Sequence, residues 1–293
     1  LHEKILDVAA VADIVFWPIA TDFKYADVEK MDDGLIDVTL FNGAIRNSEN
    51  LHLAKLLRQK SKLLVAFGSC AYLGGIPGLA NLFNRDQIFE CVYQTSPSTD
   101  GAAPPQTSTQ VPEGELTIPE FHHTVKTLDQ VVDVDYFVPG CPPTPEQIWA
   151  VLQVLLSGKL PPKGAVVGAT EKTQCDECPR IKHEKSIEVF KRIATANPDP
   201  ETCLLEQGFL CLGIATRGGC NSRCQKSGVG CRGCYGPPPG VKDQGAKVIS
   251  AIASVIKADN EADAQAIAAT IPDPIRSFNR FSIPASLLRR KSL

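Results

Sequence analysis

The 293-residue sequence is poor in aromatic residues, at 6%, has a single methionine, and carries no excess of basic residues. Its formal net charge of −3 provides no positive field that would attract a nucleic-acid backbone. No segment approaches the roughly 20 consecutive apolar residues that a membrane-spanning helix requires. These absences argue against nucleic acid as a partner and against a membrane span.

Nothing near the start of the sequence has the form of a secretion signal, in which a positively charged segment precedes an apolar one. The first residue is Leu1 rather than methionine, and it already belongs to a helical apolar pattern over residues 1–12. We therefore expect that an N-terminal piece of the protein precedes this sequence.

Cysteine, in contrast, is abundant, with eleven residues in all. The odd count and the length of the chain do not suit the disulfide framework of a small secreted protein, so we expect a cytoplasmic protein with reduced cysteines. Eight of the cysteines fall within 60 residues of the C-terminal half, and four of these form two C-x-x-C pairs. The eight are Cys175, Cys178, Cys203, Cys211, Cys220, Cys224, Cys231 and Cys234.

Cysteine pairs of this spacing bind metal centres, and four thiolates complete either one iron–sulfur cluster or one structural zinc ion. Glycines, arginines and a lysine alternate with the cysteines over residues 217–234. Glycine allows the chain to wrap tightly around a cluster, and cations offset the charge of the thiolates. Zinc ribbons usually supply their ligands as two C-x-x-C pairs, whereas four of these cysteines stand singly. The pattern therefore favours two iron–sulfur clusters and leaves two zinc sites as the alternative.

The N-terminal half alternates between apolar runs typical of strands and patterns typical of helices. The run at 62–67 is almost continuously apolar, which indicates a strand buried on both faces. Strong capping signals at Thr144, Pro145 and Gln147 begin a helix near residue 145. The alternation predicts an α/β fold with a doubly wound, mostly parallel sheet. The predicted strands are 13–18, 35–41, 62–67 and 134–138, and the first predicted helices are 1–12 and 48–60.

Cys70 and Cys141 each follow the end of a predicted strand, in a turn rich in glycine or proline. Ligands bind at this carboxyl edge of an open parallel sheet, so we expect the two cysteines to converge on one site. A role for Cys70 as an enzyme nucleophile stays open, with His122 and His123 as the nearest candidates for its base.

Two further residues that could bind a metal are expected to have other roles. Cys91 lies on a predicted helix beside Ile88 and Val92, so we expect it to be a core residue. His183 lies five residues after Cys178, but eight thiolates already suffice for two clusters, so we expect a surface histidine.

Two segments interrupt the regular pattern. Residues 95–120 hold five prolines among serine, threonine and glycine, and they predict a long surface loop, with a disordered insertion as the alternative. The adjacent prolines within 159–163 predict a domain boundary. The expected parts are a sheet domain at 1–160, a cysteine-rich domain at 161–245, and a C-terminal part at 246–293, with helices near 246–257 and 261–270 before the basic tail Arg289, Arg290 and Lys291.

Several of these motifs resemble the small subunit of nickel–iron hydrogenases. The matching segments are Phe-Gly-Ser-Cys at 67–70, the glycines and proline of 74–78, and Pro-Gly-Cys-Pro-Pro at 139–143. The same sheet and cysteines recur in the related cluster subunit of respiratory complex I. The C-terminal cysteine run and the stretch 273–286 are similar to the small (gamma) subunit of the cytoplasmic, methyl-viologen-reducing hydrogenases, which work with heterodisulfide reductase.

The resemblance implies a flavodoxin-like sheet domain followed by a ferredoxin-like, cysteine-rich domain, with three 4Fe–4S clusters in a chain. Cys70 and Cys141 match two ligands of the proximal cluster, and the eight C-terminal cysteines match the ligands of the medial and distal clusters. The family's N-terminal C-x-x-C, which supplies the other proximal ligands, is absent before Leu1. A truncated sequence is the expected explanation.

The function that the resemblance implies is electron transfer in an oxidoreductase. Hydrogen is split at a nickel–iron centre in a separate large subunit, and electrons pass through the clusters to a downstream iron–sulfur or flavin partner such as heterodisulfide reductase. The chain itself is expected to hold no catalytic residue. The alternatives are the small subunit of the deazaflavin-reducing hydrogenase and, from another class, a zinc-stabilised binding module.

Overall fold

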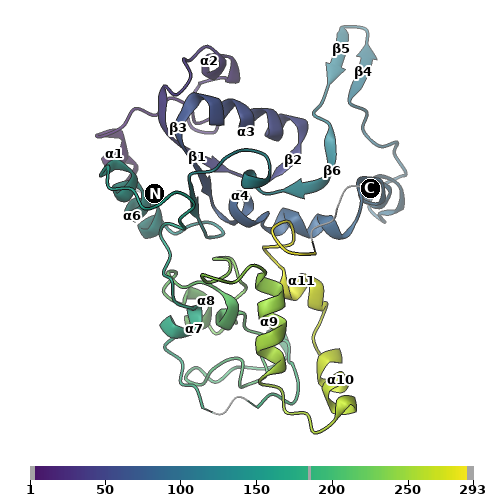
Figure 1. The fold of residues 1–293 in the computed structure, drawn as a ribbon. Coiled ribbons are helices and arrows are strands. Elements are labelled where there is room, and N and C mark those ends of the chain that lie inside the picture. Colours follow the sequence, from purple (N-terminus) through teal and green to yellow (C-terminus); the bar gives the residue numbers. More distant parts are fainter. Residues whose placement is uncertain (1–3, 184–185, 289–293) are drawn as a thin grey trace.

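The computed structural model of the protein describes residues 4–183 and 186–288. The chain forms two parts stacked one above the other (Figure 1). The upper part in that view contains the sheet, and the lower part contains the cysteine-rich region and the C-terminal helices. The segment after the last helix returns to the junction, where the carbonyl oxygens of Phe281 and Pro284 accept hydrogen bonds from Gly75 and Gln130.

The central sheet has three parallel strands, β1 (Ile36–Asn42), β3 (Ser61–Phe67) and β7 (Tyr136–Val138), in the order β1-β3-β7. The strand order places β3 in the middle. This position explains the almost continuous apolar run of β3, because a central strand is covered on both faces. The predicted strands at 35–41, 62–67 and 134–138 are confirmed, the last one in shortened form.

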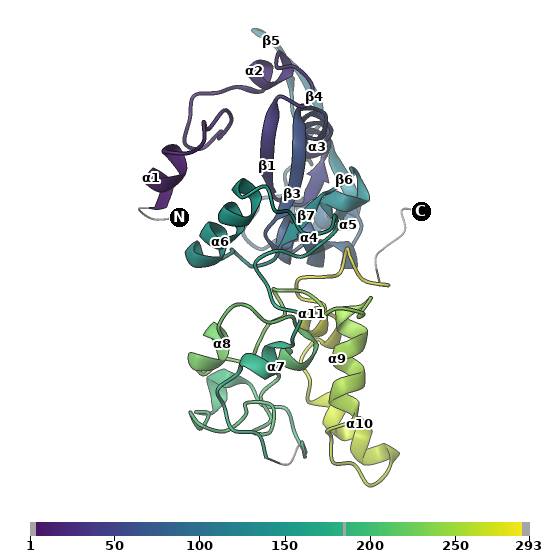
Figure 2. The same ribbon diagram turned by 60° about the vertical axis from the view of Figure 1, so that its left-hand side comes forward.

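Helices cover both faces of this sheet (Figure 2). Helix α3 (Ser48–Lys60) packs on one face, where its buried residues share a cluster with Leu64 and Ala66 of β3. Helix α6 (Pro145–Leu156) shares a second cluster with Val65, which points to the opposite face because side chains alternate along a strand. The sheet is thus wound on both sides, as the sequence predicts.

The predicted start of α6 is confirmed in detail. The hydroxyl of Thr144 accepts a hydrogen bond from the backbone N–H of Gln147, and the side chain of Gln147 accepts one from the backbone N–H of Thr144. Helix α3 begins in the same way, with Asn47 accepting from the backbone N–H of Asn50 at 2.8 Å. These caps satisfy donors that the first helical turn leaves free.

One prediction for the N-terminal half is wrong and another is confirmed only in part. Residues 13–18 form coil and a turn instead of a strand, and no described strand lies along them to supply hydrogen-bond partners. Residues 95–120 lie at the surface, as predicted, but they contain a β-hairpin of β4 (Ser108–Val111) and β5 (Gly114–Thr117). The hairpin is almost wholly exposed, so its sequence lacks the alternation of apolar and polar residues that identifies a half-buried strand.

The remaining elements are short. An antiparallel pair, β2 (Ile45–Asn47) with β6 (Phe121–Lys126), lies outside the central sheet and was not predicted. In the described part of the chain, no helix combines the length and the apolar composition that crossing a membrane would require. The other helices are α1 (Lys4–Ala9), α2 (Tyr25–Glu29), α4 (Ser69–Leu73), α5 (Arg85–Glu90), α7 (Gln174–Glu177), α8 (Arg223–Lys226), α9 (Gln244–Ala253), α10 (Glu261–Ala269) and α11 (Pro274–Phe278).

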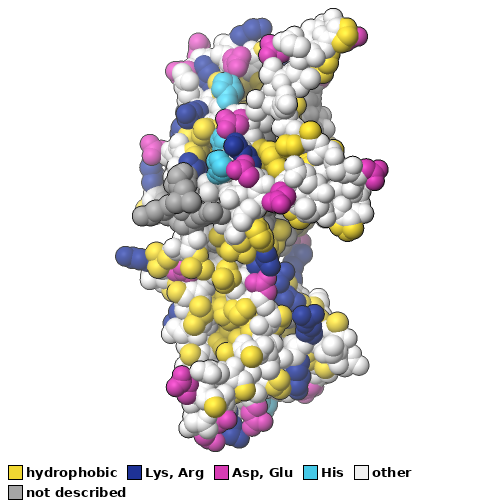
Figure 3. All heavy atoms as spheres, turned by 90° about the vertical axis from the view of Figure 1, so that its right-hand side faces the viewer, with side chains coloured by type: hydrophobic (Ala, Val, Ile, Leu, Met, Phe, Trp, Pro, Cys, Tyr) yellow, Lys and Arg dark blue, Asp and Glu magenta, His cyan; other side chains and the backbone are white. Residues whose placement is uncertain are grey.

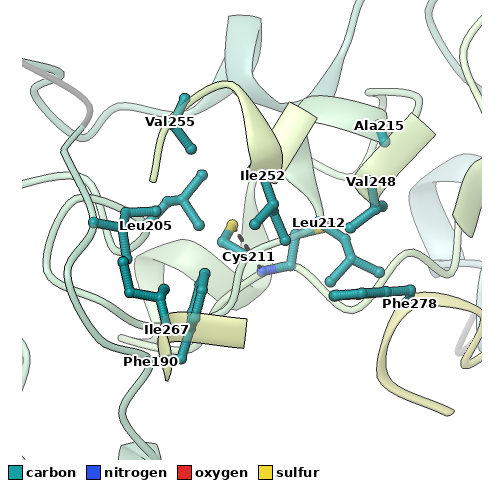
Figure 4. Packing of buried hydrophobic residues seen from close by; sticks show 12 residues of the cluster. Phe190, Leu205, Cys211, Leu212, Ala215, Val248, Ile252, Val255, Ile267 and Phe278 are labelled. Carbon is teal, nitrogen blue, oxygen red and sulfur yellow. Dashed lines mark hydrogen bonds between the residues drawn. The ribbon is translucent and has the colours of Figure 1, made fainter. Parts of the chain in front are cut away.

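The lower part is built around a hydrophobic core that the cysteine-rich region shares with the C-terminal helices (Figure 4). Leu212 and Cys211 come from the cysteine-rich region, whereas Val248 and Ile252 come from α9 and Phe278 from α11. Helices α9 and α10 confirm the helices predicted near 246–257 and 261–270. Between 161 and 245 the described residues form short helices and isolated bridges, and a ferredoxin-like arrangement is not confirmed.

Asp135 ties the sheet to α3 and to the connection between the two parts. Its carboxylate accepts hydrogen bonds from Arg58 and Lys163, each at 2.7 Å, and from the backbone N–H of Leu64 at 2.8 Å. Burial disfavours the charged form of Asp135, but the hydrogen bonds from Lys163, Leu64 and Arg58 outweigh burial and hold its pKa below the usual value.

We expect Asp135→Asn to lower the free energy of unfolding by about 2 kcal/mol at pH 7, because two cations lose their buried partner. The folded-state pKa of Asp135 is lowered, so its contribution is complete above the unfolded pKa of about 4 and is lost as the pH falls through the folded pKa. The difference between wild type and variant should therefore shrink below about pH 4, as measured by urea unfolding.

Asp37→Asn is the matched control, because it breaks the exposed ion pair of Asp37 with Lys62. Exposed pairs contribute less than about 1 kcal/mol, so this variant should unfold almost like wild type. An equal loss of stability in the two variants would contradict the role given to Asp135.

Candidate functional site

The structure brings Cys70 and Cys141 together at the carboxyl edge of the sheet. Cys70 lies in α4, directly after β3, and Cys141 follows β7. Two backbone hydrogen bonds join their turns, from Gly68 to the carbonyl of Val138 at 2.7 Å and from Ser69 to the carbonyl of Gly140 at 2.8 Å. Burial raises the pKa of the Cys70 thiol, and the charge of Cys141 raises it further. The predicted convergence of the two cysteines is therefore present.

The same pKa argues against the alternative in which Cys70 is an enzyme nucleophile. A nucleophilic cysteine needs a lowered pKa, which an adjacent cation or histidine base normally supplies. The pKa of Cys70 is instead raised, and the pKa of His122 is lowered by burial, which disfavours a histidinium partner.

Glycine is required beside Cys70 for a steric reason. Gly75 has a φ of +59°, and a Cβ atom at this position would lie 2.6 Å from the Sγ of Cys70. Gly74 similarly leaves room for Pro284, whose ring packs against it from the C-terminal segment. The glycine-rich turn at 74–78 thus lets the backbone approach Cys70 and leaves room for Pro284 to pack against the turn.

Ser69 connects this first pair of cysteines to the lower part of the molecule. Its buried hydroxyl lies 2.8 Å from the carbonyl oxygen of Gly140 and 2.6 Å from that of Cys234. Burial raises the pKa of Cys234 to about 12, and the charges of neighbouring cysteines, Cys141 among them, raise it as well. Cys234 therefore lies within electrostatic reach of the Cys70 and Cys141 pair.

Four of the C-terminal cysteines form a first group. Burial raises the pKa of Cys175 to about 12, with further contributions from Cys211, Cys203 and Cys178. Gly213 lies between two of the sulfur atoms, because a Cβ atom there would be 3.2 Å from the Sγ of Cys175 and 3.6 Å from that of Cys211. The first group is Cys175, Cys178, Cys203 and Cys211.

Three of the other four cysteines, Cys220, Cys224 and Cys234, form a second group. The pKa of Cys234 is raised by the charges of Cys220 and Cys224, after the larger effect of burial. The fourth, Cys231, lies between the two groups: burial raises its pKa well above the usual value, and the charges of Cys211 and then Cys234 raise it further. The backbone N–H of Cys231 donates to the Sγ of Cys211 at 3.2 Å, so the two groups adjoin at this point.

The surroundings of these sulfur atoms suit thiolates bound to a cationic centre. Backbone N–H groups of Gly213 and Cys231 point to the Sγ of Cys211, and those of Ser222 and Arg223 point to the Sγ of Cys220. Hydrogen bonds of this kind stabilise the charged form of a thiol. Burial and mutual repulsion disfavour the charged thiolates, and a bound cationic centre would offset both effects, so the arrangement fits a metal centre.

A structural zinc site holds four ligands at about 2.0–2.3 Å from one ion. Within residues 4–183 and 186–288, no three His, Cys, Asp or Glu side chains are placed so as to hold one metal ion together.

The predictions for two other residues have different outcomes. Cys91 is exposed, so its prediction as a core residue is wrong. It lies where α5 passes into a π-helical turn at Cys91–Thr95, and none of the residues of these two segments is buried. His183 is a surface residue, as predicted, with a side chain 63% exposed and its Nδ1 3.6 Å from Glu206. The basic tail at 289–291 lies outside the described residues.

A basic cavity of about 210 Å³ lies beside the cysteine groups. Leu210 and Gly230, which line it, directly precede Cys211 and Cys231. Burial lowers the pKa of Arg280, and the charge of Arg232 lowers it further. On the face drawn in Figure 3, Lys and Arg side chains gather along one edge of the lower part. The cations that line the cavity are Lys191, Arg192, Arg232 and Arg280, and no carboxylate lines it.

Comparison with known proteins supplies the family. Residues 1–155 match the family model described as the 20 kDa subunit of NADH ubiquinone oxidoreductase. The iron-sulfur subunit of the F420-non-reducing hydrogenase of Archaeoglobus profundus is 42% identical, over 99% of this chain and 92% of its own length. A vhu subunit of the F420-non-reducing hydrogenase of Methanocaldococcus jannaschii is 40% identical, over 100% of this chain and 91% of its own length. The chain belongs to the nickel–iron hydrogenase small-subunit family.

Membership in the nickel–iron hydrogenase small-subunit family makes the chain a subunit of an oxidoreductase. Proteins of this family typically carry iron–sulfur clusters, which is consistent with the eleven cysteines of the chain. A small subunit also implies a large subunit as its partner.

Gly75→Ala tests the packing around Cys70, and Gly101→Ala is its matched control. Both glycines have a positive φ, +59° and +71°, so alanine should cost about 1–2 kcal/mol of backbone strain at either position. Only at Gly75 would the new Cβ atom also clash with Cys70, which should add about 1–3 kcal/mol. Urea unfolding of both variants measures the difference, and equal losses would contradict the close approach of Gly75 to Cys70.

Proposed function

We propose that the chain is the electron-transferring small subunit of a nickel–iron hydrogenase, relaying electrons from hydrogen oxidation in the large subunit to a downstream partner. The proposal rests above all on one observation: ten cysteines from distant parts of the sequence lie in three adjoining groups. When bound, 4Fe–4S clusters supply one-electron transfer.

The proposed ligands follow these groups. Cys70 and Cys141 are ligands of the proximal cluster. Cys220, Cys224, Cys231 and Cys234 hold a second cluster, and Cys175, Cys178, Cys203 and Cys211 hold a third. Each C-x-x-C pair thus belongs to a different group.

The contacts between the groups also support an order in which electrons pass through them. The hydrogen bond between Ser69 and the carbonyl of Cys234 supports a position of the second group beside the Cys70 and Cys141 pair. The hydrogen bond from Cys231 to the Sγ of Cys211 supports a position beside the third group. Electrons would therefore enter near the carboxyl edge of the sheet, against the large subunit, and leave through the group that contains Cys175.

The protein contributes to this relay through its own residues. Burial of Cys211 and Cys231 keeps water away from the sulfur atoms, and backbone N–H groups stabilise their charge. Both factors set reduction potentials in iron–sulfur proteins. The basic cavity beside Cys211 and Cys231 supports an exit toward an acidic partner surface.

The names of the relatives indicate which type of hydrogenase we propose for this chain. Relatives that match almost the whole chain are called F420-non-reducing hydrogenase subunits, which favours this activity over reduction of the deazaflavin F420. We propose an iron–sulfur or flavin protein such as heterodisulfide reductase as the electron acceptor, and a cytoplasmic location.

Replacing one cysteine in each C-terminal group tests the proposal. Cys178→Ser and Cys224→Ser, purified anaerobically with the other subunits, should each lose or alter one cluster, with a fall of up to about four irons per chain. The two variants should change different signals in the electron paramagnetic resonance spectrum of the reduced protein. Both should also slow the hydrogen-dependent reduction of a protein acceptor.

Cys91→Ser is the control, because Cys91 is exposed and belongs to no group. This variant should keep its iron, its spectrum and its rate. If Cys178→Ser and Cys224→Ser abolish the same signal and leave another intact, the division into two groups is wrong. If neither variant changes iron content or spectrum, the proposed ligands are wrong.

A further inference from the structure

Gln174 is a fully buried polar side chain that contacts one of the proposed ligands. Its Oε1 lies 3.0 Å from the Sγ of Cys220, and its Nε2 donates to the hydroxyl of Ser222 at 2.8 Å. Both Gln174 and Ser222 have an exposed fraction of zero. The three side chains therefore form a short hydrogen-bonded row in which Gln174 and Ser222 are closed to solvent and Cys220 is partly buried.

Gln174 also lies between the two C-terminal groups of cysteines. It directly precedes Cys175 of one group in α7, and its backbone N–H donates to the carbonyl of Thr216 at 2.7 Å. Its side chain reaches Cys220 of the other group. The backbone hydrogen bond and the hydroxyl of Ser222 hold the amide in place beside the sulfur.

The side chain of Gln174, paired with that of Ser222, can hydrogen-bond with Cys220 in both its protonated and its deprotonated state. A protonated Cys220 donates its S–H to the Oε1 of Gln174, whereas a cluster-bound thiolate has no proton and only accepts. A half-turn of the terminal amide then places Nε2 against the sulfur and Oε1 against Ser222. The hydroxyl of Ser222 can rotate and become the donor, so no buried polar group is left without a partner.

We propose that Gln174 donates a hydrogen bond from Nε2 to the Cys220 thiolate and thereby raises the reduction potential of the cluster held by the second group. The proposal rests on the proposed function, since it requires that cluster. Reduction adds negative charge to the cluster and its sulfur ligands, so a hydrogen bond to a ligand sulfur stabilises the reduced form more than the oxidised form. Gln174 thus acts on the reduction potential of the cluster through Cys220 and takes no direct part in the oxidation of H2.

A higher potential in the second group suits its place in the relay. This group adjoins the Cys70 and Cys141 pair through Ser69 and Cys234. Raising its potential favours the movement of electrons away from the carboxyl edge of the sheet and into the lower part of the molecule.

Gln174→Met and Gln174→Glu, each in the anaerobically purified complex, test the proposal. Methionine has a similar volume but no N–H donor, so the midpoint potential of one C-terminal cluster should become more negative. Burial and the nearby thiolates raise the pKa of a glutamate at this position, so Gln174→Glu is compared below and above its carboxyl pKa: the neutral acid can still donate a hydrogen bond, whereas the carboxylate adds a negative charge and should lower the potential at least as far as methionine does. Redox titration followed by electron paramagnetic resonance measures each cluster separately, and the other clusters should keep their potentials.

Asn81→Leu is the matched control for loss of a buried amide. Both hydrogen bonds of the Asn81 side chain are to the backbone of Val125, so this variant should lose stability without a change in any midpoint potential. If Gln174→Met fails to assemble clusters, Ser222→Ala reports on the same row, because the Gln174 amide loses the donor that orients it. In Ser222→Ala, the midpoint potential of the same cluster should also become more negative, by a smaller amount than in Gln174→Met.

The outcomes separate this inference from the proposed function. If Gln174→Met assembles its clusters and the midpoint potential of the second group's cluster is unchanged, the role of Gln174 is overturned and the electron relay still stands. If Ser222→Ala has to be measured in its place, an unchanged potential in that variant has the same meaning. A wild-type complex without iron and labile sulfide would instead overturn the proposed function.

Discussion

The structure depends on the burial of many cysteine sulfur atoms close to one another. Burial and mutual repulsion raise the pKa of Cys175 and Cys234 to about 12, so the chain alone cannot hold these groups as thiolates. A cationic centre removes this penalty and makes the arrangement favourable. Glycines that leave room for sulfur, backbone N–H groups that point to it, and the apolar core around Cys211 all follow from the same requirement.

The two stacked parts of the molecule are joined where the cysteine groups meet. Ser69 hydrogen-bonds to the turns that carry Cys141 and Cys234, and Pro284 of the C-terminal segment packs on Gly74. The junction therefore brings the Cys70 and Cys141 pair close to Cys234 of the lower part. The proposed electron relay requires such closeness, because each centre must lie near the next while water is excluded.

The sequence predicted the features that depend on local patterns. The capping box at Thr144 and the apolar run of β3 are confirmed because a few neighbouring residues determine them. Other features depend on tertiary contacts. Whether the helix at Cys91 is covered, and which single cysteines join which C-x-x-C pair, are decided by how loops pack. Gln174 gave no signal at all, since a lone glutamine before a cysteine has no pattern until Cys220 folds against it.

The proposed relay requires that this chain hold iron–sulfur clusters rather than zinc. We would therefore measure the content of iron, zinc and acid-labile sulfide per chain in the wild-type complex, purified without oxygen. We expect at least about eight irons in the two C-terminal groups, with an equal amount of sulfide and no stoichiometric zinc. About two zinc ions per chain without labile sulfide would rule out the relay and indicate a zinc-stabilised module.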